Sequence, residues 1–160
     1  MASRLARKEF KDIQQLVPGM YEAMDEVGKA ISATGISEHY LELAKIRASQ
    51  MNGCAQCIGI HMNAARKMGI DPQKLDLIPA WREAGIFDDK EMAVLNWAEA
   101  LTDLAHHPIE DSAYSEIVSY FSDVEVAALT GAISVINFYN RFGAAYRHTP
   151  PRYRPAPTST

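Results

Sequence analysis

The sequence predicts an all-α protein, a single-domain bundle of six to eight helices over its 160 residues. Apolar residues recur every three or four positions along almost the whole chain, which is the spacing of one helix face. No segment gives a sustained run of the apolar–polar alternation expected of a half-buried strand. One domain suits this length, because a chain of this size can bury a substantial core.

The first half of the chain is expected to hold four helices, each with a start or stop signal. The first helix has an apolar face made of Tyr21, Met24, Val27 and Ile31, and Gly35 ends it. Ser37 caps the second helix, and Asn52-Gly53 closes it after Met51 because both residues tolerate a left-handed backbone. The third helix spans about 54–69. Asp71-Pro72 then opens a short fourth helix, which Pro79 ends.

The second half is expected to hold three further helices. Asp88-x-x-Glu91 and Ser122-x-x-Glu125 are capping-box patterns, in which the first and fourth residues bond each other's backbone N–H. The first pattern opens a helix whose apolar face continues to Leu104, before His106-His107-Pro108. The second opens the longest helix, over about 123–146. Between them, helical spacing predicts one more helix from Tyr114, Ile117, Val118 and Phe121.

Both ends of the chain are expected to lie outside the core, which spans about residues 20–147. The first dozen residues are locally basic through Arg4, Arg7, Lys8 and Lys11, and we interpret them as a frayed, solvated N-terminal arm. The tail over 148–160 contains four prolines, which exclude a helix. Two interpretations of this tail stay open: a disordered segment, or an arm laid across a neighbouring subunit.

Composition and charge argue against several classes of protein. A formal net charge of −4 is unlike that of a nucleic-acid-binding protein, which normally carries a basic stripe. The most apolar stretch, 124–138, is too short and too often interrupted by polar residues to span a bilayer. The N-terminus lacks the apolar segment of a secretory signal. We therefore expect a cytoplasmic protein with no nucleic-acid or membrane partner.

The most informative segment is a Cys-x-x-Cys-x-x-x-His pattern made of Cys54, Cys57 and His61. On a helix that begins near Cys54, these residues share one face. Both cysteines lie in the first turn, where unpaired N–H groups and the helix dipole stabilise an anion and lower the pKa of a thiol. In a reducing cytosol, such a pair is more often catalytic or metal-binding than a structural staple. A thiolate with a second thiol in reach suits reversible redox chemistry.

Two further residues can support this chemistry. His61 can accept or donate a proton at neutral pH, so it can help to form the Cys57 thiolate or protonate a leaving group. The helices joined by Asn52-Gly53 are expected to be antiparallel neighbours. At ~1.5 Å rise per residue, Glu42 and His61 then differ in height by only about one turn. A carboxylate in that place can orient His61 and raise its basicity.

Each of these residues also has a simpler interpretation. The two cysteines can be small buried hydrophobes. A metal site would use the cysteine pair, His61 and a fourth ligand. Other histidines could supply that ligand, although none stands at a recognisable ligand spacing: His39, His106, His107 and His148. Glu42 can be a solvated residue that pairs with Lys45 or Arg47. Thioredoxin also has Cys-x-x-Cys at a helix start, but within a βαβ fold, and no strand is expected here.

The arrangement of Glu42, Cys54, Cys57 and His61 in a helical chain resembles the AhpD-like alkylhydroperoxidases of the carboxymuconolactone decarboxylase superfamily. The matching core runs over about 37–69, and the later segment 136–141 also resembles the closing helix of that superfamily. The resemblance implies that Cys57 attacks a hydroperoxide, that Cys54 resolves the product to a disulfide, and that Glu42 and His61 relay protons. It also implies a homo-oligomer, a trimer or a hexamer.

One position departs from the family pattern. The best-studied members have a second relay histidine between the two cysteines, whereas this chain has Gln56, which hydrogen-bonds but carries no proton at neutral pH. From the cysteine pair and the resemblance together, we expect a cofactor-free dithiol oxidoreductase that reduces alkyl hydroperoxides and is itself reduced by an external dithiol or protein reductant. Two alternatives stay open: a cofactor-free enzyme of the decarboxylase type, and a non-enzymatic metal-binding or redox-sensing module.

Overall fold

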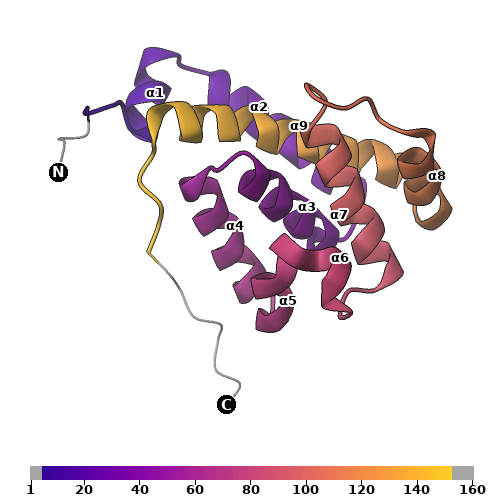
Figure 1. Ribbon diagram of the computed structural model, residues 1–160. Helices are drawn as coiled ribbons and strands as arrows, with labels where there is room; N and C mark the ends of the chain where they lie inside the picture. Colours follow the sequence, from indigo (N-terminus) through magenta and orange to yellow (C-terminus); the bar gives the residue numbers. More distant parts are fainter. Residues whose placement is uncertain (1–4, 153–160) are drawn as a thin grey trace.

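Figure 1 shows the computed structural model, which describes residues 5–152, and it confirms the all-α fold class. Within these residues there is no strand; eight helices have six residues or more, and a four-residue helix and a 3₁₀ turn complete the fold. In chain order the elements are α1 (Phe10–Leu16), α2 (Met20–Ser32), α3 (Glu38–Met51), α4 (Ala55–Lys67), α5 (Pro72–Leu77), η1 (Ile78–Ala80), α6 (Trp81–Ala84), α7 (Asp89–Thr102), α8 (Asp111–Tyr120) and α9 (Asp123–Tyr146).

Helix α3 lies at the centre of the bundle and packs against α4, α7 and α9. The long helix α9 crosses one side of the molecule next to α2, and α4 lies on the opposite side of α3 (Figure 1). The largest fully buried side chains come mainly from α3, α7 and α9; they include Leu41, Leu43, Ile46, Leu95, Leu129 and Ile133. This shared core fixes the start of α4 relative to α3 and α9, and these three helices carry the candidate site.

The predicted helix starts are confirmed by their capping contacts. The side chains of Ser37, Asp71, Asp88 and Ser122 each accept a hydrogen bond from the backbone of the first turn that follows. The last two belong to complete capping boxes. A short polar side chain before an apolar stripe supplies the partner that the first N–H groups of a helix lack, so such starts are encoded locally.

Helix α7 ends earlier than predicted, at Thr102 and not beyond Leu104. The carbonyl of Asp103 accepts hydrogen bonds from the backbone N–H groups of His106 and His107. Its carboxylate also lies 2.6 and 2.7 Å from the Nδ1 atoms of these two histidines. These bonds replace the next turn of helix by a tight polar turn and leave Leu104 exposed.

The interpretation of the N-terminus as a frayed arm is wrong from Phe10 onward. Residues 10–16 form α1, in which Ile13 is buried and the Phe10 ring stacks on Tyr21 at 4.4 Å between centroids. The Arg7 guanidinium donates to the carbonyl of Ala145 near the end of α9. The apolar face of this short helix is therefore part of the fold, while Arg4 lies outside the described residues.

The described part of the tail lies along α4 of its own chain. After α9 the chain turns past α4 (Figure 1), and the Asn63 side chain donates to the Arg152 carbonyl at 2.9 Å. A Cβ added at Gly59 would lie 2.9 Å from Pro151, so the tail packs closely there. Residues 153–160 lie outside the described part, and both interpretations of that end stay predictions.

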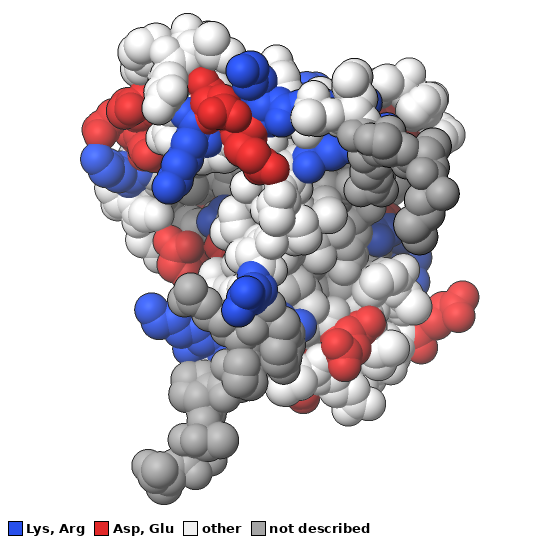
Figure 2. Space-filling model, turned by 90° about the vertical axis from the view of Figure 1, so that its left-hand side faces the viewer, with Lys and Arg blue, Asp and Glu red and all other residues white. Residues whose placement is uncertain are grey.

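The face of the molecule nearest α1 carries both signs of charge. Lysine, arginine, aspartate and glutamate side chains surround a broad central area of uncharged side chains (Figure 2). Among the described residues, no helix is both long enough and apolar enough to cross a membrane.

Candidate active site

The two cysteines form a disulfide at the start of α4. Cys54 is the N-cap of the helix, Cys57 lies in its first turn, and their Cα atoms are 5.3 Å apart. The backbone N–H of Cys57 donates to the Cys54 sulfur at 3.3 Å. Gly53, which has a φ of +65°, makes the sharp turn that brings the chain from α3 into α4. The predicted pair is therefore close enough to cycle between dithiol and disulfide.

Helix α9 packs directly against this disulfide. The Asn52 amide donates to the side-chain oxygens of Asn137 and Asn140, each at 2.9 Å, and so ties the α3–α4 turn to α9. One turn further along, a Cβ at Gly143 would overlap the Cys54 sulfur and would lie 3.3 Å from the Cys57 sulfur. Gly143 is thus required by the close approach of a helix backbone to the disulfide.

A Gly143→Ala substitution is expected to destabilise the oxidised protein by about 1–3 kcal/mol, because the new methyl group overpacks a site without free space. The matched control is Gly131→Ala in the same helix, where the added Cβ meets only the side chain of Ile31, at 3.3 Å. That change is expected to be neutral or to stabilise by up to about 1 kcal/mol through helix propensity. Denaturant unfolding of both oxidised variants measures the difference. Equal stabilities would contradict close packing at Gly143.

Glu42 and His61 meet as the sequence predicted. The Nδ1 atom of His61 lies 2.8 Å from one oxygen of the Glu42 carboxylate, and the Lys45 ammonium donates to the other oxygen at 2.9 Å. Glu42 is only 5% exposed. Burial raises the pKa of the Glu42 carboxyl, but the hydrogen bonds and positive charges of His61 and Lys45 outweigh it and leave this pKa below its usual value of 4.5. Glu42 is not the solvated residue of the simpler interpretation.

Glu42→Gln is expected to lower the free energy of unfolding by about 1.5–3 kcal/mol at pH 7, the contribution typical of hydrogen bonds to a charged group. Because the folded pKa of Glu42 is depressed, its stabilisation is present above pH 4.5 and is lost as the pH falls through the folded pKa. The difference between wild type and variant should therefore shrink below pH 4.5. Urea unfolding across this range, with the exposed Glu83→Gln as control, tests it; a constant difference would contradict the assignment.

A cavity of about 280 Å³ opens beside Cys57. Its walls are mostly aromatic and aliphatic, and its polar lining comes from Gln56, His61, His148 and Asp25. The other lining residues are Phe10, Tyr21, Ile60, Ile136, Tyr139 and Phe142. Cys57 and His61 thus face one space that can admit a small, largely apolar molecule.

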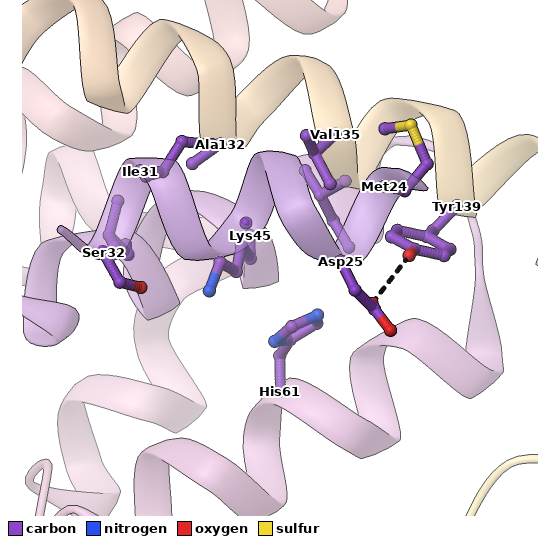
Figure 3. A pocket seen from close by; sticks show the side chains of 12 residues that line it. Met24, Asp25, Ile31, Ser32, Lys45, His61, Ala132, Val135 and Tyr139 are labelled. Carbon is purple, nitrogen blue, oxygen red and sulfur yellow. Dashed lines mark hydrogen bonds between the residues drawn. The ribbon is translucent and has the colours of Figure 1, made fainter. Parts of the chain in front are cut away.

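A second cavity, of about 190 Å³, lies on the other side of His61, between α2, α3 and α9 (Figure 3). His61, Asp25 and Tyr139 line both cavities. The Tyr139 hydroxyl donates to the Asp25 carboxylate at 3.3 Å. Burial, followed by the nearby Asp25 charge, raises the pKa of Tyr139 to about 12. Tyr139 therefore stays protonated at neutral pH, and its pair with Asp25 borders both spaces.

The structure brings the four predicted residues together and adds Gly143, which the sequence did not single out, and His148, which the sequence offered only as a possible fourth metal ligand. Gly143 packs on the disulfide, and His148 lies at the cavity wall, where its Nδ1 is 3.1 Å from the Gln56 side-chain oxygen. Local spacing gives no signal for either, because each contacts a segment about ninety residues away. Among the described residues, no group of three or more His, Cys, Asp or Glu side chains is arranged to hold a metal ion.

The bundle has the AhpD-like fold of solved structures that it resembles, and it presents a Cys-x-x-Cys pair at a helix start near a His–Glu pair. The chain belongs to the carboxymuconolactone decarboxylase family, whose model matches residues 18–100.

Individual relatives cover most of the chain. The Bacillus subtilis protein YdfG, which is uncharacterised, is 32% identical over 131 residues, or 82% of this chain and 89% of YdfG. The structure of ATU0492 from Agrobacterium tumefaciens, a protein of unknown function with a proposed assignment as antioxidant defence protein AhpD, has a TM-score of 0.85. It is 30% identical and covers 91% of this chain and 100% of its own. A peroxidase-related AhpD core from Ralstonia eutropha, 17% identical, has a TM-score of 0.75 over 88% of this chain and 75% of its own, a likeness of fold.

Proposed function

We propose that the protein is a thiol-dependent peroxidase, a dithiol oxidoreductase that reduces organic hydroperoxides. The observation that carries the proposal is the Cys54–Cys57 disulfide, whose Cys57 lines the same cavity as His61, itself held by Glu42. A thiol pair, a proton carrier and a space for a small molecule are the parts that a peroxidatic cycle requires. The proposed assignment of ATU0492 to AhpD agrees with this chemistry.

The first half of the cycle oxidises Cys57. His61 accepts the thiol proton of Cys57, and the Glu42 carboxylate, which accepts a hydrogen bond from Nδ1–H, stabilises the resulting imidazolium. The thiolate attacks the terminal oxygen of the hydroperoxide: an S–O bond forms, the O–O bond breaks, and the electron pair leaves with the alkoxide. His61 returns its proton to the alkoxide. The products are an alcohol and a sulfenic acid on Cys57.

The second half produces the disulfide that the structure contains. The Cys54 sulfur attacks the Cys57 sulfur; an S–S bond forms, the S–O bond breaks, and hydroxide leaves with the Cys54 proton as water. Two thiols and one hydroperoxide thus give one disulfide, one alcohol and one water. An external dithiol restores the reduced pair by thiol–disulfide exchange.

The homo-oligomer that the family resemblance implies, a trimer or a hexamer, stays a prediction for this chain.

Steady-state turnover tests the proposal. Wild type, supplied with an excess of a small dithiol, is expected to consume cumene hydroperoxide, whereas Cys57→Ser is expected to fall to the rate of dithiol alone. Ser119→Ala, on the exposed surface of α8, is the control for the substitution itself. Equal consumption by wild type and Cys57→Ser would contradict the proposal and would favour the decarboxylase-type or metal-binding alternatives.

A further inference from the structure

Two of the residues that line the cavity beside Cys57 each carry a buried polar atom without a hydrogen-bond partner. Within residues 5–152, the unpartnered buried side-chain atoms are the Tyr21 hydroxyl and the His148 Nε2. Both residues line the cavity that Cys57 and His61 also line. They are 2% and 3% exposed, so their partners cannot be bulk water around the protein. Leaving such a group unpaired costs about 1–3 kcal/mol, which makes a bound polar group the natural partner of each.

The hydrogen-bonding character of His148 follows from its other nitrogen. Nδ1 lies 3.1 Å from the side-chain oxygen of Gln56, and an amide oxygen only accepts hydrogen bonds, so Nδ1 carries the proton. In the neutral ring, Nε2 is then an acceptor. The Tyr21 hydroxyl is a donor that keeps its proton at neutral pH, because burial raises the pKa of this phenol. Of the polar groups on the residues that line the cavity, His148 thus carries an unpartnered acceptor and Tyr21 an unpartnered donor.

Several contacts hold these two groups in place. The chain leaves α9 through Arg147, whose φ of +54° lets His148 fold back, and the backbone N–H of His148 donates to the Gly143 carbonyl at 3.1 Å. The imidazole stacks on the Tyr146 ring at 5.9 Å between centroids. Beyond it, the hydroxyl and backbone N–H of Thr149 donate to the Glu9 carboxylate at 2.8 and 3.2 Å. These contacts hold His148 in a fixed position in the cavity wall.

We propose that Tyr21 and His148 bind the hydroperoxyl group of the substrate. The terminal O–H donates to His148 Nε2, and the oxygen attached to carbon accepts from the Tyr21 hydroxyl. The aromatic walls hold the organic part of the molecule. The pair orients the O–O bond toward Cys57 and leaves the balance of atoms and protons in the reaction unchanged. This inference rests on the proposed peroxidase function and assigns its substrate-binding groups.

Binding without reaction tests the proposal. In a Cys57→Ser background, which lacks the attacking thiol, the affinity for tert-butyl hydroperoxide is measured by ligand-observed NMR. His148→Phe and Tyr21→Phe, which keep an aromatic ring, are each expected to weaken binding about tenfold, the effect of a lost hydrogen bond of about 1.4 kcal/mol. The matched controls outside the cavity, His106→Phe and Tyr114→Phe, should bind as the parent does. Circular dichroism checks that each variant is folded.

A second ligand distinguishes the contribution of Tyr21 to binding from that of His148. Di-tert-butyl peroxide has no O–H to donate, so its binding is expected to weaken in Tyr21→Phe but not in His148→Phe. Unchanged hydroperoxide binding in both cavity variants would overturn the proposal, even if wild-type thiols react with hydroperoxide. If instead the variants lose binding while wild-type thiols survive the hydroperoxide, the binding site stands and the peroxidase function fails.

Discussion

A Cys54→Ser protein is expected to react once with a hydroperoxide and then stop. Cys57 keeps its thiol, its helix start and its neighbour His61, so the first attack proceeds. No sulfur remains to displace the sulfenic oxygen, and turnover with a low, limiting concentration of dithiol should fall at least about a hundredfold. Mass spectrometry of the intact protein should show one added oxygen atom, located on Cys57 by a sulfenic-acid trap.

The control for this prediction is the double variant Cys54→Ser/Cys57→Ser, which should take up neither oxygen nor trap. An oxygen found on Cys54 in a Cys57→Ser protein, with Cys54→Ser unreactive, would contradict the assignment. The order of attack and resolution would then be reversed. Sustained wild-type turnover in Cys54→Ser at limiting dithiol would show that resolution does not need Cys54.

Replacing His61 by asparagine is expected to slow the first oxidation of Cys57 by about 10²–10⁴-fold, the range for removal of a general acid–base group. Asparagine keeps a hydrogen-bonding side chain near Glu42 but cannot carry the proton from the thiol to the leaving alkoxide. Stopped-flow measurement of the first turnover, made with fully reduced protein, isolates this step from reduction by the dithiol.

A matched control exists in the same molecule. His39 and Glu91 form a second His–Glu pair, 2.7 Å apart, and neither residue lines the cavity. His39→Asn removes an equivalent imidazole and should leave the rate of the first oxidation within about twofold of wild type. Equal slowing by His39→Asn and His61→Asn would point to a general loss of structure, and no slowing by His61→Asn would remove His61 from the mechanism.

The sequence predicted the features that depend on local chemistry. Polar caps before apolar stripes located the starts of α3, α5, α7 and α9. The contact between Glu42 and His61 was also predictable, because the tight turn at Asn52-Gly53 fixes α3 and α4 as antiparallel neighbours. Helical rise then sets which residues can meet across that turn.

The features that the sequence did not predict depend on contacts between distant segments. The short helix α1 is stabilised by packing against Tyr21, although the basic residues before and within it suggested a solvated arm. Gly143 has no local reason to be glycine, because its neighbour is a disulfide on another helix. His148 follows a helix end and precedes prolines, which predicted an irregular tail; only the folded structure places it against Gln56.

The central claim, that Cys57 and Cys54 form a peroxide-driven redox pair, is tested most directly by counting thiols in a single turnover. Fully reduced protein is mixed with one equivalent of cumene hydroperoxide in the absence of any dithiol. We predict rapid loss of both thiols of the chain, formation of one equivalent of cumyl alcohol, and recovery of both thiols when dithiol is added. Two thiols that survive an excess of hydroperoxide would contradict the account.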